Sequence, residues 1–231
     1  MLPATRSSDV GNPAVAVLPI GSFEQHGRHL PLATDTLIAS EVARRVAERY
    51  DLLLLPPLCF SCSHEHSAFP GTVSITAATL ASLVEDISAD LARAGTGQLV
   101  IVNGHGGNYV LASIVQQANV ETRRMLLFPT SHHWTEARVA AGCSATTHED
   151  MHAGEAETSI LLDIAPEIVG DGRHNDDFSA DDRSLLSLIG MAGYTRTGVI
   201  GRPSLATREK GRALLDALVA LLAEPLKVLQ E

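Results

Sequence analysis

The sequence is short of cysteine and has no long hydrophobic run, and each shortage excludes a class of protein. Three cysteines cannot all pair within one chain of 231 residues, so a disulfide-stabilised scaffold is excluded and a reducing setting is expected. The longest aliphatic stretches, Ala14–Ile20 and Leu52–Leu55, are too short to span a bilayer. The first residues show no apolar segment of the signal-peptide type. We therefore expect a cytoplasmic protein without a membrane partner.

Basic residues are also scarce. Lys and Arg number 17 against 27 Asp and Glu, which gives a formal net charge of −10. This acidic balance disfavours nucleic acid as a partner. Apolar residues make up 45% of the chain and charged residues 19%, as in a folded protein that buries a sizeable core.

Aliphatic runs alternate with segments of helical periodicity. Strands are predicted at 14–20, 51–55, 98–102 and 125–128, and helices at 36–50, 80–91, 110–118 and 157–164. A short helix near 135–141, a polar loop over 170–182 and an amphipathic helix around 214–222 complete the second half. The alternation predicts an α/β fold with a parallel sheet and helices on both faces. No repeat or linker is evident, so residues 1–231 are expected to form one domain.

Polar segments follow the predicted strands at one edge of the sheet. They are 21–35 after the first strand, 103–108 after the third, and 152–159 beyond the fourth. Ligands of open α/β sheets bind beyond the carboxyl ends of the strands, so these segments are expected to converge.

The residue types at this edge are those that bind divalent metal ions. Glu24 and His26 are two residues apart, so in extended chain they face the same side. Asp35 falls at the start of a helix, and His105 lies in a glycine-rich turn. An aspartate between two such groups can bridge a metal pair.

Charge counting agrees with two ions. Glu24, Asp35 and Glu157 bring three negative charges, and a bridging hydroxide would balance two divalent ions. Such ions lower the pKa of bound water from 15.7 to about 7, which yields a nucleophile at neutral pH.

Two other interpretations stay open. The Gly104–Asn108 turn could bind a phosphate through backbone N–H groups in a non-catalytic nucleotide-binding module. It is not a dinucleotide fingerprint, because Tyr109 stands where a third glycine belongs. The segment with His152, Glu155 and Glu157 could be a solvated surface. His64 is expected to line the entrance of a pocket.

Three motifs resemble those of the creatininase (creatinine amidohydrolase) family. They are Gly21-Ser-Phe-Glu-Gln-His-Gly-Arg-His-Leu-Pro-Leu-Ala-Thr-Asp35, Asn103-Gly-His-Gly-Gly-Asn108 and His152-Ala-Gly-Glu-Ala-Glu-Thr-Ser159. The resemblance implies a three-layer α/β/α fold and hydrolysis of a C–N bond. It also implies two divalent metal ions, usually zinc with manganese or iron as alternatives, and a homo-oligomer, often a hexamer.

The resemblance also assigns roles to residues. Glu24, Asp35 and His105 would hold one metal, and His26 with Asp35 the second. His152 would be the proton shuttle that protonates the leaving nitrogen.

Creatininase has a glutamate ligand where this chain has Gly107, so another carboxylate must replace it. Glu157 is predicted for this role, with Glu155 as the alternative. Arg28 replaces a common proline and would bind a substrate carboxylate or pair with a nearby acid. Gly106, Gly107 and Asn108 are expected to bind substrate.

The substrate class stays open at this level. We expect a small molecule, with a non-peptide or cyclic amide ranked first and a formamide or a short peptide as alternatives within the family. A catalytically inactive member is disfavoured because the metal-directed side chains are all present.

Overall fold

A four-stranded parallel sheet forms the centre of the protein. The structure, a computed structural model, describes residues 3–231. The strand order is β2-β1-β3-β4, and the strands are β1 (Val15–Ile20), β2 (Leu53–Leu54), β3 (Gln98–Asn103) and β4 (Met125–Phe128). All six residues of β1 are buried, as expected for a strand covered on both faces. The predicted parallel sheet is confirmed.

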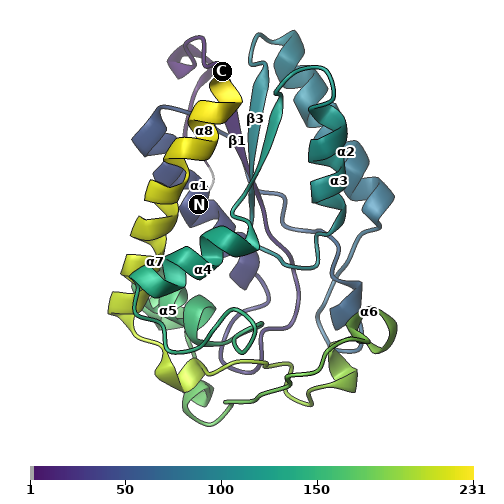
Figure 1. The fold of residues 1–231 in the computed structure, drawn as a ribbon, viewed down its shortest axis with the longest axis vertical. Helices are drawn as coiled ribbons and strands as arrows, with labels where there is room; N and C mark the ends of the chain where they lie inside the picture. Colours follow the sequence, from purple (N-terminus) through teal and green to yellow (C-terminus); the bar gives the residue numbers. More distant parts are fainter. Residues whose placement is uncertain (1–2) are drawn as a thin grey trace.

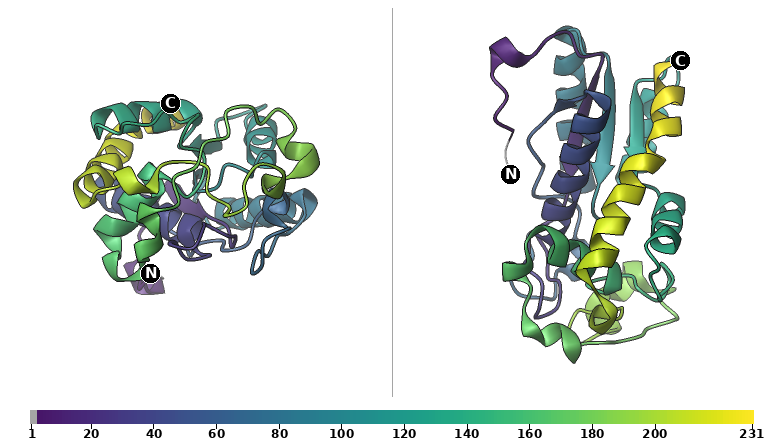
Figure 2. Two further views of the ribbon diagram at one scale, coloured as in Figure 1. Left: turned by 90° about the horizontal axis from the view of Figure 1, so that it is seen from below. Right: turned by 90° about the vertical axis from the view of Figure 1, so that its left-hand side faces the viewer.

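Helices cover the two faces of this sheet, which gives the three-layer architecture (Figure 1). One layer contains α1 (Thr34–Tyr50), α5 (Glu155–Ile164), α7 (Arg208–Leu221) and α8 (Ala223–Gln230). The other contains α2 (Ala77–Arg93) and α3 (Val110–Ala118). Alternate residues of β1 serve the two cores: Val15 and Val17 pack on the first layer, Ala16 and Leu18 on the second. Seen from the side, α7 and α8 run along one face of the sheet (Figure 2).

The remaining elements gather beyond the carboxyl ends of the strands, in the lower part of Figure 1. They are α4 (Ser131–Ala140), α6 (Leu186–Ile189) and several 3₁₀ turns: η2 (His64–His66), η3 (Pro166–Ile168), η4 (Asp171–His174), η5 (Met191–Gly193) and η6 (Pro203–Leu205). A further 3₁₀ turn, η1 (Ser7–Asp9), precedes β1. No helix within residues 3–231 is both long and apolar enough to cross a membrane.

Several helix boundaries differ from the expected ones, and three of them bear on the site or the packing. Helix α1 begins at Thr34, so Asp35 lies within its first turn. Helix α4 begins four residues earlier than predicted, at Ser131, where Thr130 caps it with His133. The C-terminal helix divides after Leu221 because Pro225 has no N–H to donate to the Leu221 carbonyl.

Candidate metal centre

The structure brings six of the predicted site residues to one place at the carboxyl edge of the sheet. Three groups of side chains each have their ligand atoms within 4.8 Å of one another. The groups are Glu24–Asp35–His105, His26–Asp35–Glu157 and Glu24–His26–His152. The loop after β1, the first turn of α1, the turn after β3 and the start of α5 supply these residues. Segments more than a hundred residues apart therefore converge as expected.

Asp35 lies between two of these groups. Its Oδ1 is 2.9 Å from Nε2 of His26, and its Oδ2 is 3.0 Å from Nδ1 of His105. The hydroxyl of Ser22 donates to Oδ2 at 2.9 Å, which fixes the carboxylate plane. Each oxygen of Asp35 thus faces a different histidine, which is the arrangement a bridging ligand requires.

Glu24 is fully buried, and neither of its carboxylate oxygens has a hydrogen-bond partner within residues 3–231. Its Oε1 lies 3.2 Å from Nδ1 of His105, 3.3 Å from Nε2 of His66 and 3.8 Å from Nδ1 of His152. An unpaired buried carboxylate is costly, because it has lost its water without gaining a partner. A cation at this position would satisfy Glu24.

Three histidines are oriented by backbone carbonyls. Nδ1 of His26 donates to Glu24 O at 3.1 Å, Nε2 of His105 to Cys62 O at 2.9 Å, and Nε2 of His152 to Gln25 O at 2.7 Å. A carbonyl only accepts, so each of these nitrogens carries the hydrogen. The other nitrogen of each ring faces the carboxylates, where it could bind a metal once any proton on it has left.

Burial and the charges within the cluster shift the pKa values of its residues. Burial lowers the pKa of His26, but Asp35 with Glu157 and Glu24 outweighs burial and raises it to about 9. Burial, opposed by His26 and reinforced by Asp35, raises the pKa of Glu157 to about 7. None of the carboxylates pairs with a lysine or arginine in the described chain. Binding of metal ions here would therefore release protons from the cluster.

Glu155 and Glu157 differ in what they contact. Oε2 of Glu157 lies 4.0 Å from Nε2 of His26 and accepts from Ala153 N–H at 2.6 Å. Glu155 points away from the cluster and pairs with Lys210. Glu157, and not Glu155, therefore lies with the side chains that could hold a metal ion.

The other predicted residues lie around the centre. Arg28 is largely exposed, and its guanidinium pairs with the buried Asp176 at 3.3 Å. The side chain of Asn108 is buried; it accepts from Cys62 N–H at 3.1 Å and donates to Asn103 Oδ1 at 3.0 Å. Gly106 is exposed, and Gly107 partly so. Substrate binding by these residues stays a prediction.

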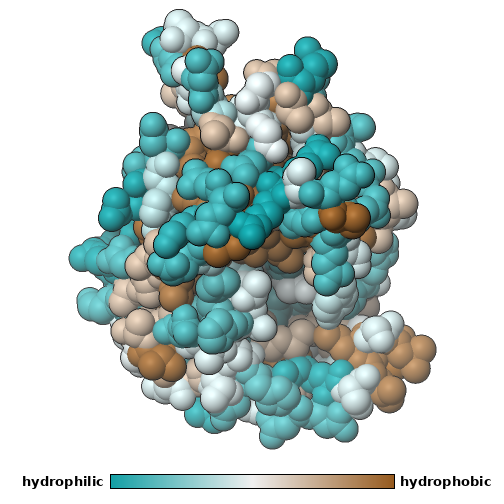
Figure 3. Space-filling view, turned by 45° about the horizontal axis from the view of Figure 1, so that its top comes forward, coloured by the Kyte–Doolittle hydropathy of each residue, from teal (hydrophilic) through white to brown (hydrophobic). Residues whose placement is uncertain are grey.

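A cavity of about 450 Å³ opens beside the centre. His64 lines it together with Gly107, Tyr109, Leu188 and Ile189. The space-filling view shows hydrophobic surface gathered at the lower right, where α6 lies in Figure 1 (Figure 3). Leu188 is 77% exposed and Tyr109 71%. The approach to the centre is therefore partly apolar.

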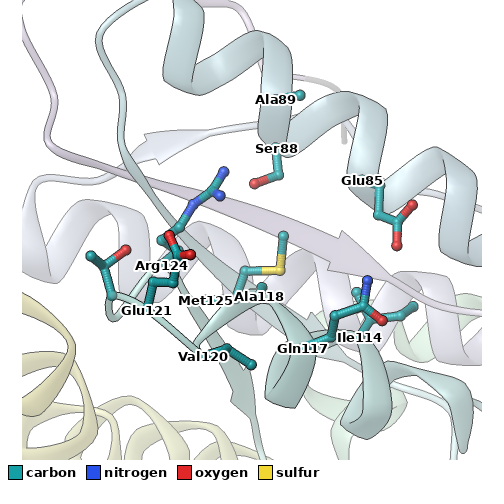
Figure 4. Close-up of a pocket in the computed structure, with 11 residues that line it drawn as sticks. Glu85, Ser88, Ala89, Ile114, Gln117, Ala118, Val120, Glu121, Arg124 and Met125 are labelled. Atoms are coloured by element: carbon teal, nitrogen blue, oxygen red, sulfur yellow. The ribbon is translucent and has the colours of Figure 1, made fainter.

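A second cavity, of about 430 Å³, lies near the amino end of β4 between α2 and α3 (Figure 4). Glu85, Glu121 and Arg124 line it. It is at the wrong edge of the sheet for a ligand site of this fold, and none of the metal-ligand groups found in residues 3–231 is there.

Sequence reasoning missed two residues of the centre. His66 is buried beside Glu24, and Gln25 Nε2 lies 2.9 Å from its Nδ1. The His64-Glu-His66 spacing is also that of metal ligands, but a loop lining the entrance was the favoured interpretation over metal binding. Glu65, between them, contacts His105.

A three-layer α/β fold with carboxylates and histidines grouped around a shared aspartate defines a metal-dependent hydrolase. Residues 4–226 match the family model Creatininase, described as creatinine amidohydrolase. The chain belongs to the creatininase family and is an amidohydrolase of that family.

Named relatives and solved structures agree with this assignment. The chain is 38% identical over 216 residues to the mycofactocin precursor peptide peptidase of Mycobacterium ulcerans, covering 88% of this chain and 80% of the relative. It is 29% identical over 233 residues to the creatinine amidohydrolase of Pseudomonas putida, covering 92% and 88%. A crystal structure of creatinine amidohydrolase superposes with a TM-score of 0.78 at 27% identity, covering 92% and 89%. The predicted family and fold are confirmed.

Proposed function

We propose that this protein hydrolyses an amide C–N bond with two divalent metal ions. Glu24, Asp35 and His105 would hold one ion, and His26, Asp35 and Glu157 the other. The observation that carries the proposal is the buried Glu24, whose carboxylate has no hydrogen-bond partner in residues 3–231 and faces histidine nitrogens.

Bound there, the ions would polarise the substrate carbonyl and supply a water acidic enough to give hydroxide near neutral pH. The chain itself fixes the geometry, because backbone carbonyls orient the three histidines. It also limits water access, since Glu24, His26 and Asp35 are almost completely buried.

His152 is the residue proposed to move the proton. Burial and the neighbouring His26 and His66 hold the pKa of His152 well below its usual range. Because Nε2 donates to Gln25 O, the free lone pair is on Nδ1, which faces Glu24. Nδ1 would take a proton from water and deliver it to the leaving nitrogen, since a neutral amide leaves poorly without one.

A short peptide with an apolar side chain is the substrate that the observations favour. The relatives named as peptide peptidases are 34–38% identical, against 29% for the creatinine amidohydrolase. The cavity of about 450 Å³ with Tyr109 and Leu188 at its wall has more room than a small cyclic amide fills. The cyclic amide that the sequence ranked first is the alternative to be tested beside it.

A phosphate at the Gly104–Asn108 turn is disfavoured. The carboxylate of Glu65 lies against Gly107, and Asp35 and Glu24 contact His105 in the same turn. Three carboxylates would repel a phosphate in the absence of metal.

Zinc is the first choice for both ions, with manganese and iron as alternatives, because mixed oxygen and nitrogen donors choose weakly among divalent metals. Similar solved creatininases, 26% identical, are described as a Zn-Zn type and as a Mn form. A homo-oligomer, a hexamer by resemblance, and a cytoplasmic setting stay expectations; light scattering on the purified protein tests the first.

Elemental analysis and an activity panel test the proposal. We expect two equivalents of divalent metal per chain and metal-dependent release of an amine from short peptides. Cyclic amides and formamides serve as the competing substrates in the same assay. Protein that binds no divalent metal, or cleaves every substrate equally well after chelation, would contradict it.

A further inference from the structure

Glu65 is a carboxylate beside the metal centre that the proposed mechanism does not use. It lies in the turn η2, and 15% of its side chain is exposed. Its Oε1 is 3.2 Å from Nε2 of His105. This nitrogen is on the side of the ring that faces away from Glu24 and Asp35.

The two nitrogens of His105 have different surroundings. Nδ1 faces the metal centre, 3.2 Å from Glu24 Oε1 and 3.0 Å from Asp35 Oδ2. Nε2 faces two acceptors, the Cys62 carbonyl at 2.9 Å and Glu65. Nε2 therefore carries the hydrogen, and Nδ1 is the nitrogen free to bind a metal. A carboxylate behind a histidine ligand holds the ring and makes it a stronger donor.

The glycine at position 107 makes room for this contact. A Cβ there would lie 1.9 Å from Glu65 Oε1 and 2.4 Å from His105 Nε2, far inside contact distance. Any side chain at 107 would displace the carboxylate or the ring. Residue 107 has no side chain, and the carboxylate of Glu65, from η2, lies against it instead.

The position of Glu65 is fixed from its other side by the segment between α6 and η5. Gly190 adopts φ 64° there, and a Cβ on it would be 2.8 Å from the Glu65 carbonyl oxygen. Oδ1 of Asn108 accepts from Cys62 N–H at 3.1 Å. This hydrogen bond positions residue 62, whose carbonyl oxygen faces the same His105 nitrogen as Glu65 does. Three separate segments therefore support one hydrogen-bonding arrangement.

We propose that Glu65 is a positioning residue for His105. Its carboxylate accepts from Nε2–H, fixes the ring and strengthens Nδ1 as a ligand of the half-site formed with Glu24 and Asp35. This inference rests on the proposed two-metal function. It predicts that the half-site of His26, Asp35 and Glu157 is independent of Glu65.

Zinc titration of the full chain in chelator-buffered solution tests this. Glu65→Gln removes the charge and keeps the shape, and Glu85→Gln is the matched control because Glu85 is exposed and remote. We expect one equivalent of zinc to bind about 10–100-fold more weakly in Glu65→Gln, with the other unchanged. Glu85→Gln should bind both as the parent protein does.

Cobalt substitution gives a readout that a merely structural role would not move. The visible spectrum of bound Co²⁺ reports ligand geometry, so the band of one equivalent should change in Glu65→Gln and stay constant in Glu85→Gln. Glu65→Asp keeps the charge on a shorter side chain and should bind more tightly than Glu65→Gln. Circular dichroism checks that each variant is folded, and Glu65→Asp decides the question if Glu65→Gln is not.

The outcomes separate this inference from the proposed function. Two zinc ions bound by Glu65→Gln with parental affinity and spectrum would overturn the role of Glu65 and leave the proposed function intact. If Glu65→Gln bound both zinc equivalents more weakly to the same extent, Glu65 would not act through His105 alone, and the proposal would be wrong. A parent protein that binds no divalent metal would overturn both proposals.

Discussion

Two buried acidic clusters lie close together in this protein, and they are neutralised in different ways. The paired cluster consists of Asp150 with Arg138 and Glu155 with Lys210. Asp150 lies 2.7 Å from Arg138, and Glu155 accepts from Ser144 N–H and Ala145 N–H, each at 2.9 Å.

The metal cluster consists of Glu24, His26, Asp35, His105 and Glu157. No lysine or arginine of residues 3–231 pairs with its carboxylates, and Glu24 has no hydrogen-bond partner among them. The difference shows that burial of acids does not by itself indicate a metal site. The informative feature is a buried acid whose neighbours are histidines and which no lysine or arginine of residues 3–231 pairs with.

The largest expected effect is the loss of the shared carboxylate. Asp35→Asn should lose both metal equivalents, because Asp35 contacts both histidine groups. Turnover should fall by more than about 10³-fold, since metal chemistry contributes several kcal/mol to the transition state. Elemental analysis and peptide cleavage measure this. Full metal content in Asp35→Asn would contradict the bridging role.

The second expected effect concerns proton transfer within the metal cluster. His152→Ala should lower kcat by about 10²–10⁴-fold and keep both metal equivalents, because a proton shuttle is not a ligand. Metal content is measured on the same sample. Loss of metal together with activity would make His152 a ligand, which the proximity of its Nδ1 to Glu24 and His26 allows.

The third prediction concerns the paired cluster. Glu155→Gln should lower the free energy of unfolding by about 3 kcal/mol, because it leaves Lys210 without its buried partner. For a chain of this size that is a fall in Tm of roughly 6–12 °C. Metal content should stay at the parental value. If Glu155→Gln lost metal and kept its Tm, Glu155 would be the metal ligand, and Glu157 would not.

The smallest expected effect comes from the same Glu-to-Gln change made in the metal cluster. In metal-free protein, Glu24→Gln should change the free energy of unfolding by no more than about 1 kcal/mol, because relief of a buried carboxylate without a hydrogen-bond partner is offset by loss of its attraction to the protonated His26. Urea unfolding in the presence of a chelator measures the difference. Destabilisation comparable to that of Glu155→Gln would show that attraction to the histidines far outweighs the cost of burying Glu24.

Much of the fold was predictable from local patterns. The aliphatic runs of β1, β3 and β4 located the strands within one residue, because strands covered on both faces are continuously apolar. The C-terminal helix was predicted only around 214–222, so the first turns of α7 and the whole of α8 were missed.

The convergence of the candidate site was predictable where its residues follow strands, and unpredictable where tertiary contacts decide. The sequence predicted that Glu24, His26, Asp35 and His105 meet at one edge of the sheet, and their side chains lie together there. The choice between two glutamates depends on Lys210, 55 residues along the chain from Glu155, which no local pattern reveals.

The backbone carbonyls behind the histidines have a consequence for how the protein would acquire the proposed ions. Main-chain groups belong to the rigid frame, so the rings stay aimed at a common point before any cation arrives. Loading then requires protons to leave but no rearrangement of the chain. Side chains of the pocket wall such as Leu188 are not part of this frame, so their substitution would leave the aim of the histidines as it is.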